Sequence, residues 1–238
     1  MFGSKRNVWL TGLVLAFGAT VALADDLDAV EKKLVEAFRK HKSVTAKVTM
    51  TSRMEMPGML MEMDGQGTLE MARRDDKSLV RMEMKTTMNN KVGQDVSKME
   101  QQTLTVVDGE AAYVLTETMG QKTAMKSKID PQMGGDPQAL FANLRKDHTL
   151  KLLPEETLEG RKMYVIEGTP KEKPEVGPAK QVYYFDQDTG FMAKFVMFNA
   201  DGKPMTTMAY TDLKFDVSID PDHFKFKAPP GVQVMEQP

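Results

Sequence analysis

The chain has 238 residues, with 34 acidic and 32 basic side chains that give a formal net charge of −2 at pH 7. This nearly neutral balance, with both signs interspersed, gives no indication of nucleic-acid binding. There is no cysteine, which excludes disulfides, thiol catalysis, cysteine metal ligands and an acylated cysteine anchor. Methionine is the unusual residue type, with 21 copies against 11 Phe and 5 Tyr, so we expect flexible apolar surfaces.

Residues 1–24 have the three parts of a secretory signal. Lys5 and Arg6 precede an apolar run from Val8 to Val21, and Ala22-Leu23-Ala24 supplies a small-residue cleavage site. The apolar run is shorter than the about 20 residues that a membrane span needs. We therefore expect cleavage after Ala24 and export to the periplasm, with residues 25–238 as a single domain that has no lipid anchor.

The first expected element is an amphipathic helix that begins at the start of the exported chain. Apolar side chains recur at three- and four-residue spacing from Leu27 to His41. At Val44 the period changes to two and continues to Met56, which predicts a long strand with one solvated face. A Pro-Gly turn should lead into a second strand, with a bend where Gly65 and Gly67 occur.

Further strands follow in chain order, and a helix interrupts them once. Alternating patterns predict strands at 79–88, 101–107, 111–118, 122–126, 149–153, 161–168, 181–185, 191–199 and 205–215. Asp136 followed by Pro137 predicts the start of a helix that extends to Asp147. About ten strands with two helices predict an α+β fold in which one curved antiparallel sheet packs against the helices.

Residues suited to catalysis are scarce. The three histidines, His41, His148 and His223, are far apart in the sequence, and no pair has metal-ligand spacing. No Gly-x-Ser-x-Gly elbow, phosphate loop or dinucleotide fingerprint occurs. We therefore expect no catalytic residues, no metal and no cofactor, and so not an enzyme.

The methionine-rich run from Met54 to Met63 has two interpretations. Thioethers in an exported protein can bind Cu(I), because they are soft ligands. The other interpretation is an apolar wall, since these methionines share one phase of two strands and neither His nor Cys lies among them. We favour the apolar wall, and Cu(I) titration with these methionines changed to Leu distinguishes the two.

The exported chain resembles the periplasmic lipoprotein carrier (LolA-like) family. Four segments carry the resemblance, namely Ser43 to Thr49, Gly65 to Arg73, Val107 to Tyr113 and Ile219 to Val234. The resemblance implies an incomplete, half β-barrel, whose curved antiparallel sheet has an apolar concave side that receives acyl chains and is closed by a few helices. The chain departs from the family in Arg74, where proline is common, in a long 170–180 loop and in methionine at aromatic positions.

The resemblance also implies roles for particular residues. Arg73 matches the arginine that hydrogen-bonds the helical lid in the closed state and releases it when cargo binds. The first helix and the segment 136–147 are the candidate lids. The residues expected to line the hydrophobic ligand cavity lie on the strands and on the second helix: Val48, Met50, Leu69, Met71, Val80, Met82, Met84, Tyr113, Leu115, Leu140, Phe141 and Leu144.

These features predict a soluble periplasmic carrier that binds acyl chains of lipoproteins or lipids and shuttles them towards the outer membrane. Each acyl CH₂ exposed to water costs about 0.8 kcal/mol, so such cargo needs a carrier. We expect a monomer whose partners are its acylated cargo, an inner-membrane releasing transporter and an outer-membrane acceptor. The alternative function is a sensing module, in which the same cavity reads lipids or stray lipoproteins and reports to a membrane partner.

Overall fold

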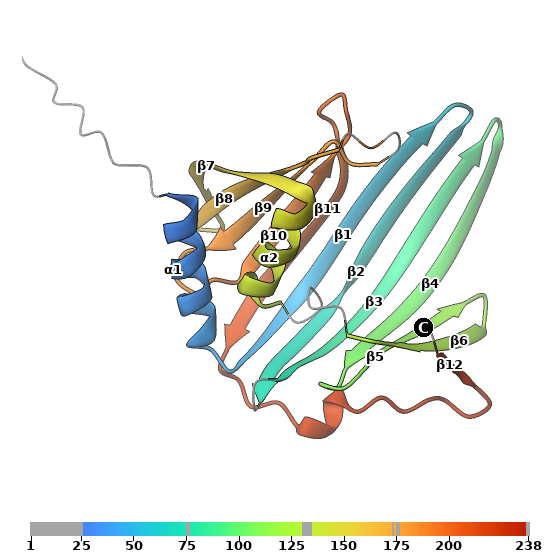
Figure 1. The fold of residues 1–238 in the computed structure, drawn as a ribbon. Helices are drawn as coiled ribbons and strands as arrows, with labels where there is room; N and C mark the ends of the chain where they lie inside the picture. Colours follow the sequence, from blue (N-terminus) through green and yellow to red (C-terminus); the bar gives the residue numbers. More distant parts are fainter. Residues whose placement is uncertain (1–25, 75–76, 130–134, 173, 175–176, 237–238) are drawn as a thin grey trace, which may run out of the picture.

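The computed structural model describes residues 26–74, 77–129, 135–172, 174 and 177–236, so the expected signal at 1–24 lies outside the described residues. No helix in these ranges has the length and apolar character needed to cross a membrane. The helical elements are α1 (Leu27–Arg39), α2 (Pro137–Asp147) and the 3₁₀ turn η2 (Pro221–Phe224). The strands, shown in Figure 1, are β1 (Ser43–Met56), β2 (Met59–Arg74), β3 (Lys77–Val92), β4 (Asp95–Val107), β5 (Ala112–Thr118), β6 (Gln121–Ser127), β7 (His148–Leu158), β8 (Arg161–Pro170), β9 (Lys180–Asp186), β10 (Met192–Phe198), β11 (Pro204–Phe215) and β12 (Val234–Glu236).

The strands of the described residues form one 12-stranded sheet in the order β12-β6-β5-β4-β3-β2-β1-β11-β10-β9-β8-β7. Neighbouring strands run antiparallel, except for the parallel pair of β12 and β6. β12 and β7 are the two edges, so the sheet is open and does not close into a barrel (Figure 1). The predicted class, one large antiparallel sheet that packs against helices, is confirmed.

The long hairpins in the first half of the sheet follow the alternation in the sequence. β1 pairs with β2 along the whole length of β1, and the turn between the two strands contains Gly58 with a φ of 76°. β2 continues through Gly65 and Gly67 without a break, so the expected bend there is wrong. Gly67 instead permits a close approach of β3, because a Cβ atom at this position would overlap the carbonyl oxygen of Glu83.

Both helices lie on one side of the sheet, over its second half (Figure 1). Asp136 caps α2 by accepting a hydrogen bond from the backbone of Gln138 at 2.9 Å, as the sequence predicted. The helices bury their apolar stripes against β8 and β9 in a first core: Val30, Leu34, Phe141, Leu144, Tyr164, Ile166, Tyr183 and Phe185. Burial of a large apolar side chain contributes about 1.5–3 kcal/mol, so this core holds both helices in place.

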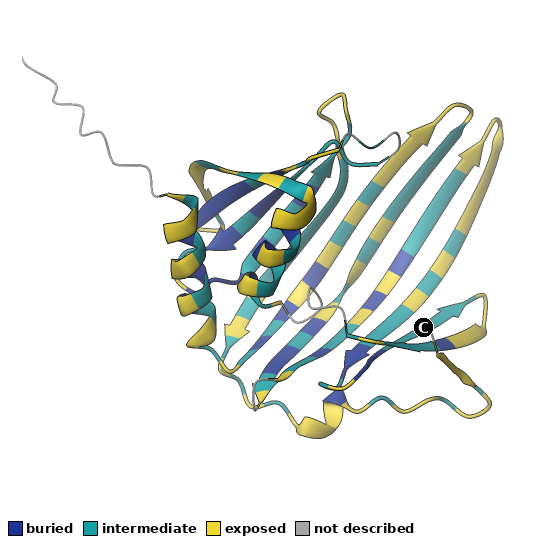
Figure 2. Ribbon diagram, in the orientation of Figure 1, coloured by how far each residue is buried: buried dark blue, intermediate teal, exposed yellow. Residues whose placement is uncertain are grey.

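A second core lies on the same side of the sheet, beside the end of α1. Its buried members come mainly from β1, β2 and β3: Val44, Ala46, Val48, Leu69, Met71, Val80, Met84, Val107, Ala112 and Phe191. Phe38 of α1 and Ile129 pack against them. Exposure rises along the long strands away from the helices (Figure 2), and Met54 and Met56 near the hairpin turn are each 37% exposed.

The segment after β11 runs along the end of the sheet and reaches its free edge (Figure 1). Phe224 of η2 is buried, and the ring of Phe226 stacks on Tyr113 with 4.9 Å between the ring centroids. β12 then pairs with β6. The sequence patterns did not predict this strand, because three residues are too few to show a period.

Candidate functional site

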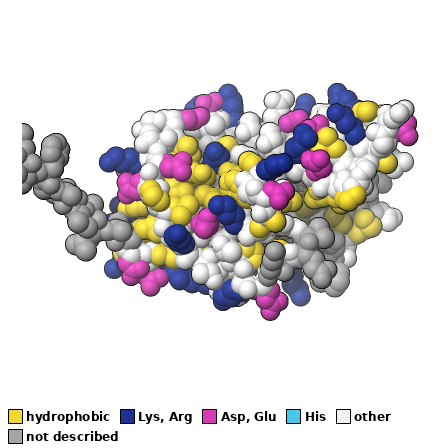
Figure 3. All heavy atoms as spheres, turned by 90° about the horizontal axis from the view of Figure 1, so that it is seen from above, with side chains coloured by type: hydrophobic (Ala, Val, Ile, Leu, Met, Phe, Trp, Pro, Cys, Tyr) yellow, Lys and Arg dark blue, Asp and Glu magenta, His cyan; other side chains and the backbone are white. Residues whose placement is uncertain are grey.

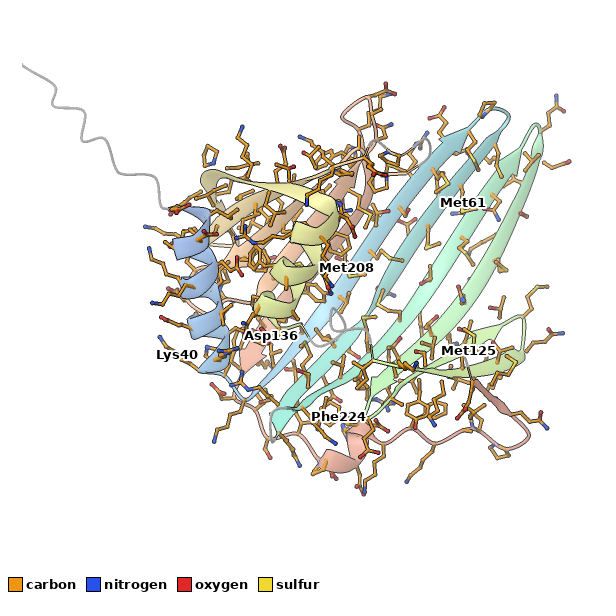
Figure 4. All side chains as sticks on the ribbon, viewed as in Figure 1. Lys40, Met61, Met125, Asp136, Met208 and Phe224 are labelled. Atoms are coloured by element: carbon orange, nitrogen blue, oxygen red, sulfur yellow. The ribbon has the colours of Figure 1, made fainter. Side chains whose placement is uncertain are left out.

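Methionine side chains from four neighbouring strands gather on the helix-bearing side of the sheet. Directly paired residues and every second residue along a strand share one face of a sheet, so the strand register places these side chains together. We name this surface the methionine face, and its members are Met54, Met56, Met59, Met61, Met63, Met88 and Met99. Met61 lies on the upper part of the long strands, well away from both helices (Figure 4).

Direct cross-strand pairs build the methionine face. Met63 pairs with Met88, and Met88 pairs with Met99, so three thioethers lie in one row across β2, β3 and β4. The other four members pair with one another across the hairpin of β1 and β2. Opposed Cβ atoms in a sheet are about 4.5–5.5 Å apart, which is within contact range for these long side chains.

The methionine face is only partly covered by the protein. Its members have intermediate exposure, apart from the more exposed Met54 and Met56. Seen from above, hydrophobic side chains gather in the middle of the molecule, with charged side chains both among and around them (Figure 3). Covering apolar surface contributes about 25 cal/mol per Å², so an apolar ligand on this face would be stabilised in proportion to its contact area.

One polar side chain on the methionine face has a buried atom without a partner. Asn90 of β3 lies directly between Met61 of β2 and Ser97 of β4. Its side-chain oxygen Oδ1 is inaccessible to solvent and accepts no hydrogen bond from any described residue. Such an atom is uncommon, because the large majority of buried polar atoms in proteins are hydrogen-bonded.

The residues expected to line one cavity lie in three different places. Seven of them lie together on the helix-bearing side of β1, β2 and β3: Val48, Met50, Leu69, Met71, Val80, Met82 and Met84. Leu140, Phe141 and Leu144 pack in the first core, between α2 and the sheet. Tyr113 pairs with Val106 and Leu115 pairs with Leu104. These even-numbered residues of β4 alternate with the odd-numbered ones, such as Met99, that face the helix-bearing side, so Tyr113 and Leu115 point to the opposite side. The expectation that these two residues share the cavity is wrong. Neighbouring residues of a strand point to opposite faces of the sheet, so a phase that is wrong by one residue places a side chain on the wrong face.

The seven residues on the helix-bearing side form a filled core. Val48 is 1% exposed and Leu69 is 5% exposed, and both pack against other buried side chains. An acyl chain in this place would have to displace packed side chains, which native packing density resists. The methionine face is open and continues from this core along the strands. We therefore regard the methionine face, rather than the core, as the candidate site.

Met88, Met99 and Asn90 belong to the candidate site but were not among the predicted site residues. Met88 ends a predicted strand, whereas Met99 lies before the next predicted strand, which was expected to begin at residue 101. β4 in fact begins at Asp95. A hairpin centred on Gly93, with a φ of 61°, could have paired Met88 with Met99 from the sequence.

Arg73 contacts the end of α1. Its guanidinium Nη2 donates to the carbonyl oxygen of Arg39, the last residue of α1. Its backbone N–H donates to the carbonyl oxygen of Lys42 at 2.8 Å. The last carbonyl groups of a helix lack intrahelical donors and carry partial negative charge, so a guanidinium stabilises this end. This is the kind of hydrogen bond that would hold a helical lid closed. The release of this hydrogen bond when cargo binds stays a prediction.

We expect Arg73→Leu to keep the fold and to loosen the end of α1. The lost hydrogen bond is partly exposed, so its removal should lower the free energy of unfolding by only about 1 kcal/mol. Hydrogen exchange of the last turn of α1 measures the loosening. Arg74→Leu is the matched control, because Arg74 Nη2 donates at 3.2 Å to Ile219 O, in the segment after β11. Equal protection of α1 in the two variants would contradict the role of Arg73 in holding the end of α1.

The connection between α1 and β1 also forms hydrogen bonds with the residue that follows β11. The backbone N–H of Lys42 donates to Asp216 Oδ1 at 2.8 Å, and His41 Nδ1 lies 2.7 Å from Asp216 Oδ2. These hydrogen bonds, the backbone one first, lower the pKa of Asp216, so its carboxylate is ionised at neutral pH. The ring of His41 also lies against that of Phe215, with 4.6 Å between the ring centroids and the two planes tilted by 42°.

Two titratable side chains with raised pKa values belong to the packing of the cores, Tyr183 in the first core and Tyr210 against the second. Burial raises the pKa of Tyr183 and of Tyr210 to about 12, so both hydroxyl groups are neutral at pH 7. The Tyr210 hydroxyl donates to the sulfur of Met208 at 3.2 Å. Within the described ranges, no group of three or more His, Cys, Asp or Glu side chains could hold a metal ion. The expectation that the protein is not an enzyme stays a prediction.

Sequence comparison finds two partial matches. A family model whose description reads "Uncharacterized protein" matches residues 121–220. An uncharacterized protein of Methanocaldococcus jannaschii is 31% identical over 134 residues, which are 56% of this chain and 37% of that protein. The chain therefore spans little more than a third of the length of this curated relative.

Solved structures with a similar arrangement are distant in sequence. MucB is 18% identical with a TM-score of 0.42, over 84% of this chain and 62% of MucB. An uncharacterized conserved protein of Thermus thermophilus is 13% identical with a TM-score of 0.46, over 87% and 98%. A LolA superfamily protein of Nitrosomonas europaea is 15% identical with a TM-score of 0.28, over 85% and 99%.

Proposed function

We propose that the protein is a periplasmic carrier that binds acyl chains of lipoproteins or lipids on the methionine face. The observation that carries the proposal is the set of seven partly exposed methionines, which four strands bring to one side of the sheet. Each acyl CH₂ removed from water contributes about 0.8 kcal/mol. Methionine is unbranched and polarizable, so the face can adapt to chains of different length without directional bonds.

The second core, which adjoins the methionine face along the strands, lies beside the end of α1, and this supports a carrier that both holds and releases its cargo. Phe38 of α1 packs on the core from which the methionine face continues. An acyl chain that extended from the face into this core would compete with Phe38, and so would weaken the hold of Arg73 on α1. The expected export signal and the resemblance to lipoprotein carriers support a periplasmic cargo and its delivery to the outer membrane.

Two triple variants at Met63, Met88 and Met99 test the proposal. All three changed to Leu preserves apolar contact, whereas all three changed to Thr removes it and suits a strand equally well. Loss of about 1 kcal/mol at each position predicts about 100-fold weaker binding of a fluorescent palmitoyl probe to the Thr variant. The Leu variant should bind within about 3-fold of the native protein.

Urea unfolding must first show that both variants are folded, so that a loss of affinity reports a change in the ligand site and not a loss of structure. Unchanged affinity in the Thr variant would place the ligand somewhere other than the methionine face. A native protein that fails to bind both the probe and a diacylated lipopeptide would refute acyl binding itself.

A soft metal ion is the second candidate ligand, because Met63, Met88 and Met99 lie in one row. Three thioethers without a hard ligand suit Cu(I). The Leu triple variant separates the two functions, since it keeps the apolar contact and removes every sulfur atom of the row. Loss of Cu(I) binding in competition with bicinchoninate, with acyl binding retained, would support the metal site. Equal Cu(I) affinity in the native protein and the variant would reject it.

A further inference from the structure

The upper half of β4 is paired on one side only. β3 pairs with β4 along its whole length, whereas β5 pairs only with the part from Gln101 to Val107. β5 ends there because a two-residue turn, formed by Met119 and Gly120, reverses the chain into β6. In Figure 1 no described segment lies beyond the upper half of β4. Residues 95–100 therefore form a free strand edge, which we name the open edge.

Backbone groups of alternate residues point to the open edge. In an antiparallel sheet, every second residue of a strand turns both its N–H and its C=O towards the same neighbouring strand. The N–H of Asp108, directly after β4, donates at 3.2 Å to the carbonyl oxygen of Ala111, on the side of β5. The register of β4 has no bulge, so Val96, Lys98 and Glu100 present their N–H and C=O groups to the open edge. Such a row of unpaired groups is a template for a further strand.

β7 and β1 also have free edges, but these are interrupted or shorter. β7 contains Pro154 and a β-bulge beside it, and both features oppose the addition of a strand. The unpaired end of β1, residues 53–56, has only four residues. The open edge contains no proline. Its charged side chains, Lys98 and Glu100, pair with each other at 3.2 Å and lie on the face away from the helices.

An extended polypeptide segment is the ligand that fits the open edge. A second backbone offers alternating donors and acceptors at the strand spacing of about 3.3 Å per residue. A guest strand beside the open edge would lie in line with β5. Its residue opposite Met99 would continue the row that Met63, Met88 and Met99 form across three strands. An acyl chain attached to such a segment therefore lies within reach of the methionine face.

The two faces of a guest strand would meet different surroundings. On the helix-bearing side, its side chains would adjoin the thioether of Met99. On the opposite side they would adjoin an open hollow of about 620 Å³, whose walls include Lys98, Glu100, Glu117 and Met119. Most of the side chains that line this hollow are polar. A segment in which apolar and polar residues alternate matches both faces.

We propose that the open edge binds the polypeptide of an acylated cargo as an added strand, so that the protein selects lipoproteins over free lipids. The inference rests on the proposed function, because the acyl chains of the same cargo lie on the methionine face. A lipoprotein carries its acyl chains on its own polypeptide, so the two parts of the cargo reach neighbouring parts of the site. In strand addition, main-chain hydrogen bonds supply affinity and alternate side chains supply specificity.

Three diacylated lipopeptides test the added strand. They share their acyl chains and an uncharged eight-residue sequence of alternating valine and serine. One has an unmodified backbone, and the other two carry N-methyl groups on the odd-numbered or on the even-numbered residues. Only one of these two sets of N–H groups faces β4 in an added strand. In displacement of the fluorescent palmitoyl probe, one methylated form should bind about 10-fold more weakly than the unmodified lipopeptide, and the other within about 3-fold of it.

Lys98→Pro tests the same contact from the side of the protein. It removes the central N–H of the open edge and leaves the pairing with β3, because this N–H faces away from β3. The variant should bind the unmodified lipopeptide about 10-fold more weakly, and the palmitoyl probe, which has no peptide, within about 3-fold of the native protein. Lys98→Thr is the matched control, since it removes the same charge and keeps the N–H. It should retain the native affinity for the lipopeptide.

Three results would overturn the added strand while leaving acyl binding intact. The two methylated lipopeptides could bind equally, or a folded Lys98→Pro variant could keep the native affinity for the lipopeptide. Analytical ultracentrifugation could also show a native dimer that Lys98→Pro dissociates, which would make a second copy the occupant of the open edge. If urea unfolding shows that Lys98→Pro is not folded, the methylated lipopeptides decide alone. Failure of the native protein to bind the palmitoyl probe and every lipopeptide is a different result, and it refutes the proposed function itself.

Discussion

Replacement of Gly190 by Ala is expected to detach α1 from the sheet and to lower the free energy of unfolding by about 3 kcal/mol or more. Gly190 lies in the turn between β9 and β10 and has a φ of 67°. A Cβ atom there would overlap the carbonyl oxygen of Leu34 and would lie 2.8 Å from the backbone nitrogen of Phe38. The backbone of α1 rests directly on this turn, so neither side can move without separating the helix from its core.

Gly202→Ala provides the matched control for this experiment. Gly202 also has a positive φ, of 76°, but a Cβ atom there meets nothing within 4 Å. Its substitution carries only the conformational cost of a left-handed residue, about 1 kcal/mol. Urea unfolding followed by circular dichroism measures both variants, and the difference between them reports the contact with α1. Equal destabilisation would show that α1 does not rest on the turn.

Phe141→Ala is expected to lower the free energy of unfolding by about 3–5 kcal/mol, because it leaves a large cavity in the first core. Phe141 is 0% exposed, and its ring centroid lies 5.4 Å from that of Phe185 on β9. Leu140→Ala on the same helix is the control, since Leu140 is only partly buried. It should cost clearly less than Phe141→Ala in the same urea titration.

The size of the Phe141 effect also bears on the lid hypothesis. A loss of less than about 1 kcal/mol would mean that α2 is loosely held and can move as a lid. A loss in the expected range makes α2 part of the permanent core. Release of α1 alone would expose Val30 and Leu34, at a cost of about 1.5–3 kcal/mol each, and bound cargo would have to offset that cost.

The order of elements was largely predictable from local patterns, because a period of two or of 3.6 is visible in the sequence. The strand expected at 79–88 exists as Lys77–Val92, longer at both ends. Asp136 and Pro137 marked the start of α2 correctly, since capping depends on adjacent residues. β12 was not predictable, because its position depends on pairing with a distant strand.

The sequence by itself determined which residues alternate, where the helices begin, and that thioethers would dominate one phase of the first two long strands. Only the tertiary structure decided which phase of each strand faces the helices, and so moved Tyr113 and Leu115 to the opposite side. It also brought Met88 and Asn90 to the methionine face. The physical reason is that strand register and the covered side of a sheet depend on long-range pairing and packing, which no local period contains.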